Sequence, residues 1–287
     1  MPGIRELRDR VKGVKNIQQI TRAMKMVASA RLHKAQQQLL EARPYAAKLC
    51  DMIRQLAGHA PAECHPLLRV CEQAPEAWVV LASDKGLCGG FNAQPLQRVG
   101  RVLAEAPAGK LPEVLVLGRK GVDFFRRTGV KPFREWAGFW QDLNWHHANL
   151  VGQEMIEAFA AGRWSKVTLV YNRFKSALVQ EAVSEQMLPL PPADTQPLGR
   201  YREFEFEPDA AEILAALLPR YVKMSLWHAL LESKAAEQAA RMQAMDNATD
   251  NAGEMIGDLT LKMNRARQAM ITREIAEVVG SAEAVMA

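Results

Sequence analysis

Residues 242–270 read MQAMDNATDNAGEMIGDLTLKMNRARQAM, and this stretch decides the fold. Its apolar or small side chains recur in alternating steps of three and four residues, which is the heptad spacing of a coiled-coil helix. The positions of this seam are Met242, Met245, Thr249, Ala252, Ile256, Leu259, Met263, Ala266 and Met270. Residues 220–287 contain no proline, so we expect a single helix of about 100 Å. A compact chain of this length has a radius of gyration of only about 19 Å, so the helix is expected to project.

The partner of this helix is predicted at the other end of the chain. Residues 3–43 also lack proline and carry an apolar stripe that is less regular than the C-terminal heptad. Its members are Ile4, Leu7, Val11, Val14, Ile17, Ile20, Met24 and Val27. Small residues that permit close helix approach are Ala23, Ala28, Ser29, Ala30, Ala35, Ala235, Ala236, Ala239, Ala240 and Ala244. We therefore expect a long antiparallel coiled coil of the two ends, in preference to two ordinary helices of a bundle.

Pro44 interrupts the first helical stretch, which resumes as far as Leu56. Either the helix kinks there, or a second helix begins with Pro44 in its first turn. Gly58 ends it, and the proline-rich residues 59–76 are predicted to form a loop.

The middle of the chain alternates short apolar runs with helical stretches, which predicts a Rossmann-like α/β domain inserted between the two helices. Strands are expected at residues 78–83, 113–117, 130–133, 167–171 and 178–188, with an edge strand at 201–206. Helices are expected up to about residue 105, at 120–128 and at 150–161. The predicted domains are residues 1–57 and 209–287 for the coiled coil, 58–77 for a connecting loop and 78–208 for the α/β domain.

The charge of the chain is concentrated at one end. Residues 1–43 hold ten Lys and Arg against three Asp and Glu, a balance of +7, whereas the whole chain carries +5. A basic helix suits nucleic acid, an anionic membrane surface or an acidic protein sleeve, or is simply a solvated face. The aromatic interleaving and recognition modules of a nucleic-acid-binding protein are missing, so we expect no nucleic-acid partner.

Composition also bounds the compartment and the chemistry. No apolar run is long enough to span a membrane, and the N-terminus lacks the features of a signal peptide, so the chain is expected to face the cytoplasm. The cysteines Cys50, Cys64, Cys71 and Cys88 form no CxxC pair, and reduced thiols are expected, with a Cys64–Cys71 disulfide as the alternative. We expect no metal and no cofactor.

The glycine-rich turn at residues 84–92, DKGLCGGFN, follows the first predicted strand. It contains neither the GxGxxG of a dinucleotide site nor the Lys-Ser/Thr of a P-loop. Asp84, Lys85 and Cys88 could be imagined as a base, an anion clamp and a nucleophile, but no histidine lies nearby to complete a Cys/His pair. The turn is predicted to be structural and to meet a partner.

The last helix changes its apolar face near its end. Arg273 breaks the heptad, and apolar side chains continue at Ile271, Ile275, Val278 and Val279. If the first helix pairs along its whole length, pairing ends near residue 274 and leaves about 20 Å of helix without a partner. Such an apolar tip requires a socket in another protein. Gly253 and Gly257 are interpreted as sites of close approach to the first helix, with local flexibility as the alternative.

Three separated motifs resemble one family over essentially the whole chain. They are IRELRDRVKGVKNIQQITRAMKMVASARLHKAQ, SDKGLCGGFN and AARMQAMDNATDNAGEMIGDLTLKMNRARQAMITREIAEVV. The chain resembles the gamma subunit of the F-type ATP synthase. The resemblance implies a non-catalytic rotor shaft inside a hexamer of alpha and beta subunits. Its α/β domain is then expected against the epsilon subunit and the c-subunit ring, peripheral to the cytoplasmic face of a bacterial inner membrane.

The resemblance also implies positions for partner contacts. Met24 and its neighbour Lys25 are expected to face the acidic loop of a beta subunit, and Cys88 to lie near the same loop. Arg241 and Gln268 are expected to be tied to coupling, and the tip at Ile271, Ile275 and Val279 to turn in the bearing of the hexamer. Met270 and Asp246 depart from the family pattern, which leaves single contacts open.

Three other functions fit the sequence less well. An α/β enzyme with a helical dimerisation arm lacks a catalytic constellation, and a nucleic-acid-binding coiled coil lacks recognition modules. A structural coiled-coil tether with an α/β interaction domain fits the two helices but does not account for the shifted apolar tip.

Overall fold

The computed structural model describes residues 3–57, 65–69, 71, 73–107, 111–190, 207 and 209–286. The chain divides into two compact units. The helical unit joins residues 1–28 to residues 242–287, and the sheet unit comprises residues 29–241. Two long helices, α1 (Ile4–Ala57) and α5 (Ala210–Met286), contribute to both units.

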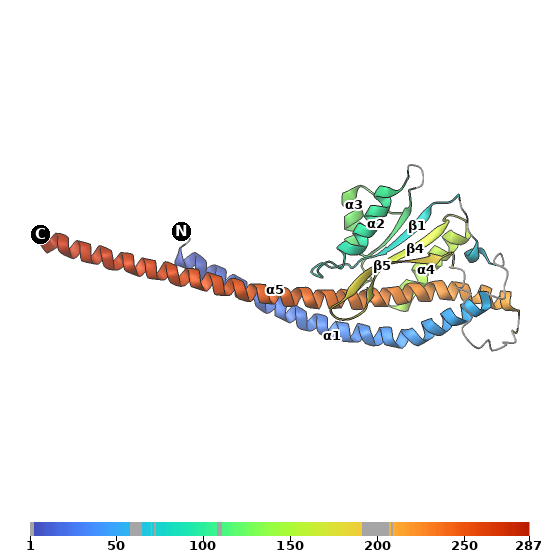
Figure 1. Ribbon diagram of the computed structural model, residues 1–287, viewed down its shortest axis with the longest axis horizontal. Helices are drawn as coiled ribbons and strands as arrows, with labels where there is room; N and C mark the ends of the chain where they lie inside the picture. Colours follow the sequence, from blue (N-terminus) through green and yellow to red (C-terminus); the bar gives the residue numbers. More distant parts are fainter. Residues whose placement is uncertain are drawn as a thin grey trace. The chain divides into compact units, whose positions relative to one another are not determined.

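The helical unit is an antiparallel helix pair (Figure 1). Thr21 of α1 meets Thr249 of α5, and Lys25, later in α1, meets Asp246, which comes earlier in α5. Rising numbers on one helix therefore face falling numbers on the other. This confirms the predicted antiparallel pairing of the two ends.

The α1 side of the seam differs from the predicted stripe. Its buried or half-buried positions include a row spaced by three and four residues, Ile4, Leu7, Val11, Val14, Gln18, Thr21, Lys25 and Ala28, together with Met24 beside Lys25. Of the predicted members, Ile17, Ile20 and Val27 instead have 55%, 59% and 51% of their surface exposed. Side chains spaced by three and four residues fit either of two adjacent rows on a helix. Here α5 packs against the row that contains polar residues, so the predicted positions Ile17, Ile20 and Val27 do not belong to the seam.

Helix α5 keeps the predicted seam only as far as Ala266. The seam positions from Met242 to Ala266 are buried or half-buried, whereas Met270 is exposed. Counting along the register from Thr21 opposite Thr249, Ile4 falls opposite Ala266. Helix α1 therefore ends before it reaches Met270.

The unpaired end is longer than estimated, because the estimate that pairing ends near residue 274 counted from Arg220. Helix α5 begins at Ala210, within the predicted limits 209–287, and Pro219 lies inside it. Proline is tolerated early in a helix, where few intrahelical hydrogen bonds are lost. Because α5 starts earlier than the estimate assumed, each α1 residue pairs with an earlier α5 residue. Pairing of the two helices therefore ends before residue 274. Helix α1 likewise runs through Pro44 without a break.

The small residues are divided between the seam and the outer surface. Buried or half-buried are Ala28, Ala35, Ala235, Ala236, Ala239, Ala240 and Ala244, whereas Ala23, Ser29 and Ala30 are exposed. A Cβ on Gly253 would lie 3.2 Å from Gln18 Nε2, in agreement with close approach. A Cβ on Gly257 would meet nothing within 4 Å, so the same interpretation of Gly257 was wrong.

The sheet unit contains a five-stranded sheet in the order β3-β2-β1-β4-β5. The strands are β1 (Glu76–Leu81), β2 (Glu113–Leu117), β3 (Arg134–Trp136), β4 (Lys166–Phe174) and β5 (Gln180–Leu188). The first four are parallel, and β5 runs antiparallel to β4. The helices are η1 (Pro66–Leu68), α2 (Ala93–Glu105), α3 (Arg119–Thr128) and α4 (Trp145–Ala160). This is the predicted Rossmann-like arrangement.

Helices cover both faces of the sheet (Figure 1). On one face α2 and α3 bury a core that includes Val99 and Phe125. On the other face α4 packs with parts of α1 and α5, burying Met155, Leu49 and Leu226. The central strands are buried on both faces, which explains why they are continuous apolar runs.

Some predicted elements lie elsewhere. The strand expected at residues 130–133 is found at Arg134–Trp136, and helix α4 begins at Trp145 rather than at residue 150. Asn144 starts α4 with a capping box that it shares with His147. The predicted edge strand at 201–206 and the Cys64 partner of a disulfide lie outside the described residues. Across the helices that the structure describes, none has an apolar stretch long enough to cross a membrane.

Candidate functional site

The predicted contact residues fall into two groups, one in each unit. The helical unit carries Met24, Lys25, Gln268, Ile271, Ile275 and Val279, and the sheet unit carries Cys88 and Arg241. Each group has a distinct chemical environment.

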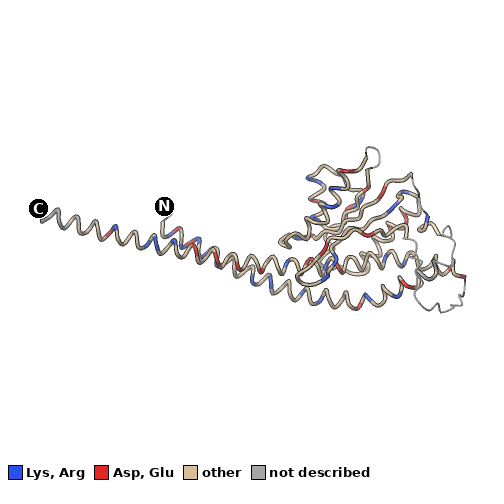
Figure 2. Tube along the Cα trace, in the orientation of Figure 1, with Lys and Arg blue, Asp and Glu red and all other residues tan. Residues whose placement is uncertain are grey.

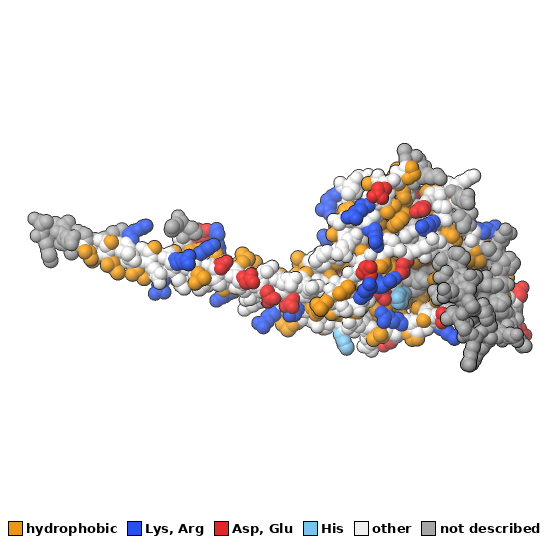
Figure 3. All heavy atoms as spheres, viewed as in Figure 1, with side chains coloured by type: hydrophobic (Ala, Val, Ile, Leu, Met, Phe, Trp, Pro, Cys, Tyr) orange, Lys and Arg blue, Asp and Glu red, His pale blue; other side chains and the backbone are white. Residues whose placement is uncertain are grey.

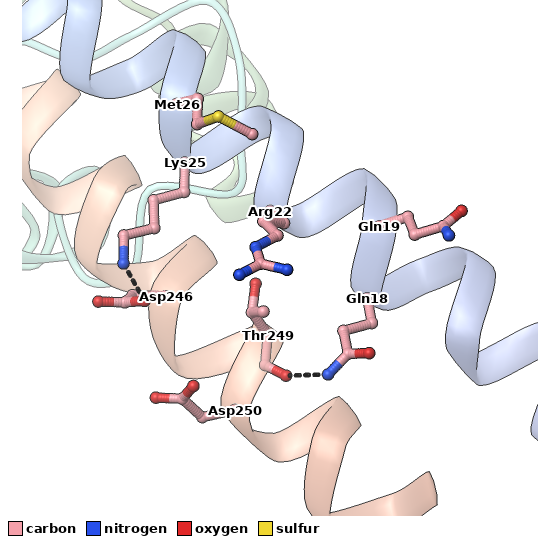
Figure 4. A pocket seen from close by; sticks show the side chains of 8 residues that line it. All are labelled: Gln18, Gln19, Arg22, Lys25, Met26, Asp246, Thr249 and Asp250. Atoms are coloured by element: carbon pink, nitrogen blue, oxygen red, sulfur yellow. Dashed lines mark hydrogen bonds and ion pairs between the residues drawn. The ribbon is translucent and has the colours of Figure 1, made fainter.

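Lys25 belongs to a polar stretch of the helix pair (Figure 4). Its Nζ lies 2.5 Å from Asp246 Oδ1, with both side chains about half exposed, while Met24 beside it is partly buried. Lys25 is therefore engaged within the chain. An ion pair this exposed contributes about 1 kcal/mol or less.

Hydrogen bonds replace apolar packing at the next layer of the seam. The Oγ1 atoms of Thr21 and Thr249 lie 2.8 Å apart, and Gln18 Nε2 donates to the Thr249 carbonyl at 3.3 Å. A shallow cavity of about 460 Å³ lies beside them, and its other lining residues include Arg22 and Asp250 (Figure 4). Polar residues in a heptad seam specify register at some cost in stability. We interpret this stretch as the feature that sets how α1 and α5 are aligned.

The acidic row Asp246, Asp250, Glu254 and Asp258 recurs every four residues along α5, beginning opposite Lys25. Basic residues recur along the same part of α1, and both colours occur along this helix pair in Figure 2. Part of the positive charge of α1 therefore meets acidic groups of its own chain.

The end of α5 presents bare apolar side chains (Figure 3). Ile271, Ile275, Val278 and Val279 have 41%, 59%, 67% and 51% of their surface exposed, and Gln268 is exposed as well. A run of exposed branched apolar residues marks an interaction surface.

The cysteine of the turn at residues 84–92 is buried. Cys88 is only 2% exposed, and Asn92 Nδ2 donates a hydrogen bond to its Sγ at 3.2 Å. Burial raises the pKa of the Cys88 thiol, although the nearby Arg241 guanidinium opposes the rise. A buried thiol with a raised pKa is a poor nucleophile. The apolar side chain that the turn exposes is its neighbour, Leu87, whereas Phe91 is buried.

Asp84 is fully used as a hydrogen-bond acceptor. Its carboxylate accepts the backbone N–H groups of Arg119, Gly138 and Trp140 at 2.9–3.1 Å. Arg119 is the first residue of α3, so Asp84 caps that helix and ties the 138–140 loop to the turn. The imagined role of a catalytic base is not supported.

Arg241 contacts the same turn from α5. Its Nη2 donates to the Gly86 carbonyl at 3.2 Å and to Glu237 Oε1 at 2.7 Å. The other oxygen of Glu237 accepts Trp140 Nε1 at 2.8 Å and Gln238 Nε2 at 3.0 Å. All of these contacts lie inside the sheet unit.

Glu237 and Trp140 were missed in the sequence. The spacing of Glu237 four residues before Arg241 is the helical ion-pair signal that could have revealed the first. Nothing local indicates Trp140, because its partner lies 97 residues away. These contacts can hold elements together, and no metal-binding cluster occurs among the residues that the structure describes.

Comparison with known proteins decides the family. A family profile described as ATP synthase matches residues 3–285. A gamma chain of Pelotomaculum thermopropionicum is 44% identical over 285 residues, which cover 99% of this chain and all of the relative. The chain belongs to the ATP synthase gamma-chain family.

Other gamma chains and solved structures agree with this. The gamma chain of Heliobacterium modesticaldum is 41% identical over 292 residues, covering 99% of this chain and all of that one. A chain from the Tetrahymena thermophila mitochondrial ATP synthase central stalk and c-ring is 28% identical, with a TM-score of 0.60, over 80% of this chain and 99% of its own. A chain from the Euglena gracilis mitochondrial ATP synthase has the same fold, with a TM-score of 0.68 at 19% identity over 98% of this chain and 94% of its own.

A gamma chain is the central shaft of the ATP synthase and performs no catalysis itself. Family membership confirms the prediction of a non-catalytic shaft subunit. Helix pairing, the capped turn and the buried ion pair are then features of a part that transmits motion.

Proposed function

We propose that this gamma-family chain turns inside a hexamer of alternating alpha and beta subunits and is driven from an epsilon subunit and a ring of c subunits. Proton flow through the ring turns the shaft, and the shaft drives each beta subunit through its nucleotide states. The complex is proposed to lie at the cytoplasmic face of a bacterial inner membrane. Association with a c-ring is supported by the matched Tetrahymena chain, which comes from a central stalk and c-ring structure.

One observation carries this proposal: the bare apolar end of α5. Counting by the register of the seam, α1 stops opposite Ala266, and the helix continues to Met286. The exposed residues Ile271, Ile275, Val278 and Val279 lie beyond the point where α1 ends. Water is a poor environment for this surface, and a bearing of apolar side chains in the hexamer would cover it.

The remaining predicted contacts are part of this proposal. Met24 and Lys25 are proposed to face an acidic beta-subunit loop, and Gln268 to contact the hexamer just before the tip. For Lys25 this requires the Asp246 ion pair to be shared or exchanged. The weakness of an exposed ion pair makes such an exchange inexpensive.

Reconstitution tests the proposal. The full chain is mixed with cognate alpha and beta subunits, and the copy number in the purified complex and its ATPase activity are measured. We expect one copy per hexamer and an activity that depends on this chain. A chain lacking residues 271–287 is expected to lose more than half of that activity, because its tip no longer fills the bearing.

A milder pair of variants separates the tip from general surface effects. Ile275→Ser with Val279→Ser removes two exposed apolar side chains from the tip. Leu178→Ser with Val179→Ser removes two that are at least as exposed, in the sheet unit. Only the first pair is expected to lower activity. Failure of the full chain to associate with alpha and beta subunits would overturn the proposed function.

A further inference from the structure

The turn at residues 84–92 contains a residue with an unfavourable backbone conformation and a solvent-exposed side chain. Leu87 has a φ of 62°, in the left-handed region that branched side chains rarely adopt, and it is 65% exposed. Its side chain gains little from packing within the chain. Such strain persists only where the surroundings hold the backbone in place.

A closed ring of contacts holds this turn. From Asp84 in the turn, the ring passes to the backbone of Trp140, through the Trp140 indole to Glu237, along α5 to Arg241, and back to the turn at Gly86. Within this ring, the Glu237 carboxylate accepts hydrogen bonds from two other members, Trp140 and Arg241. It is also buried, with its side chain 4% exposed.

The turn itself is braced from within. Ser83 Oγ donates to the Lys85 carbonyl at 2.6 Å, and Asn92 Oδ1 accepts the Ser83 backbone N–H at 2.8 Å. Internal bonds therefore fix the shape of the turn, and the ring through Glu237 fixes its place against α5.

A buried ion pair is a poor choice if stability alone is required. Removing two charges from water costs about as much as their attraction returns, and apolar replacements often serve equally well. The directional bonds of Glu237 offer rigidity instead. A strained, exposed leucine whose backbone is held rigidly is suited to contact a second protein.

We propose that Glu237 is a positioning residue that locks the turn to α5, so that Leu87 is presented as an apolar contact to a neighbouring subunit with an apolar recess. The proposal rests on the function proposed above, because it assigns the turn a place in transmitting the motion of the shaft. Arg241 then acts through the turn and makes no direct contact with the partner.

The alkylation rate of Cys88 reports whether Glu237 holds the turn against α5. Its thiol is buried in the turn, whereas Cys71 is exposed and serves as an internal standard. The rate of alkylation by a maleimide is measured at each cysteine of the full chain by peptide mass spectrometry. Glu237→Gln is expected to speed labelling of Cys88 about tenfold, because loss of a charged hydrogen bond makes opening of the turn easier.

Two comparisons keep this result interpretable. Glu232→Gln alters an equally buried carboxylate of α5 that accepts the Phe174 backbone N–H and does not touch the turn. Labelling at Cys88 should then change less than twofold. Arg241→Met removes a positive charge beside Cys88, whereas Glu237→Gln removes a negative one, so simple electrostatic effects on the thiol have opposite signs. If Glu237 and Arg241 hold the turn in place, both variants should speed labelling of Cys88. Changes of opposite sign in the two variants would overturn the proposal.

The functional part is tested in the reconstituted complex with its membrane sector. ATP hydrolysis and ATP-driven proton pumping are measured together, and their ratio reports coupling. Glu237→Gln is expected to lower the pumping-to-hydrolysis ratio at least twofold. Leu87→Asn, which tolerates the left-handed backbone, is expected to lower it similarly while Cys88 stays slow to label.

The outcomes are distinguishable. If Cys88 is labelled faster but coupling stays at the wild-type ratio, the ring is merely structural and the proposal is overturned. If the wild-type chain does not assemble with alpha and beta subunits, the proposed function fails. The Cys88 comparison in the isolated chain still decides whether Glu237 locks the turn.

Discussion

The same two helices are buried very differently in the two units. In the helical unit, α5 buries a single row against α1, and most of its other side chains are exposed. In the sheet unit, every α5 residue from 229 to 239 except Lys234 is buried. There the helix packs against α1, α4 and the sheet core, so its neighbours surround it. The burial of a helix therefore depends on how many elements pack around it. The helical sequence pattern reveals only the row of side chains that faces one such element.

The largest effect is expected from truncating a core residue of α5 in the sheet unit. Leu226 is fully buried, so Leu226→Ala should lower the free energy of unfolding by about 2–5 kcal/mol. Leu259→Ala in the helical unit, where the side chain is only half buried, should cost at most about half as much. Urea unfolding followed by circular dichroism compares them, and equal losses would contradict the difference in burial.

A glycine substitution probes the looser packing of the helical unit. Gly257→Ala should stabilise α5 by about 1 kcal/mol, because alanine favours the helix and the new Cβ meets nothing. Gly253→Ala should gain less, since its Cβ would lie 3.2 Å from the Gln18 side chain. Amide hydrogen exchange across residues 242–266 measures both, and a larger gain at Gly253 would contradict the packing.

The polar layer provides a smaller test of how the helix pair is specified. Thr21→Val with Thr249→Val replaces a hydrogen-bonded pair by an apolar pair of similar shape. We expect a gain of about 0.5–1 kcal/mol, because replacing both partners is neutral or stabilising. Hydrogen exchange of the same segment measures the gain. A clear loss would show that the hydroxyl pair supports stability as well as register.

The smallest effect is a pH dependence confined to the sheet unit. Burial lowers the pKa of His228, outweighing the opposing influence of Glu232. The unfolded chain therefore binds the proton first as pH falls. Stability should be full above about pH 6.5, the pKa of an unperturbed histidine, and decline below it. His228→Gln should flatten this decline.

The six tryptophans lie in the sheet unit, so their fluorescence follows its unfolding between pH 7 and pH 5. His33→Gln, which alters an exposed histidine, is the control and should leave the profile of the wild type. A His228→Gln profile that also matches the wild type would refute the assignment.

The sequence alone predicted the features that rest on local or periodic signals. The heptad on α5 from Met242 to Ala266 was readable because coiled-coil packing repeats every seven residues. The strand at Glu113–Leu117 was placed correctly, because residues 114–117 are all apolar and buried. The family motifs indicated a gamma-type shaft. The domain limits and the partner or coupling positions expected at Met24, Lys25, Cys88, Arg241, Gln268 and the tip stay predictions.

Tertiary structure decided what depends on a neighbour far away in the chain. Ile17 and Gln18 are adjacent, and only the position of α5 determined that Gln18 faces the seam and Ile17 faces outward. The burial of Cys88 likewise depends on the way the turn folds back on itself. Glu237, Trp140 and Asp84 acquired their roles through contacts that span up to 97 residues. A helical or strand period records which side of an element is apolar, but the partner that covers it is chosen by packing in three dimensions.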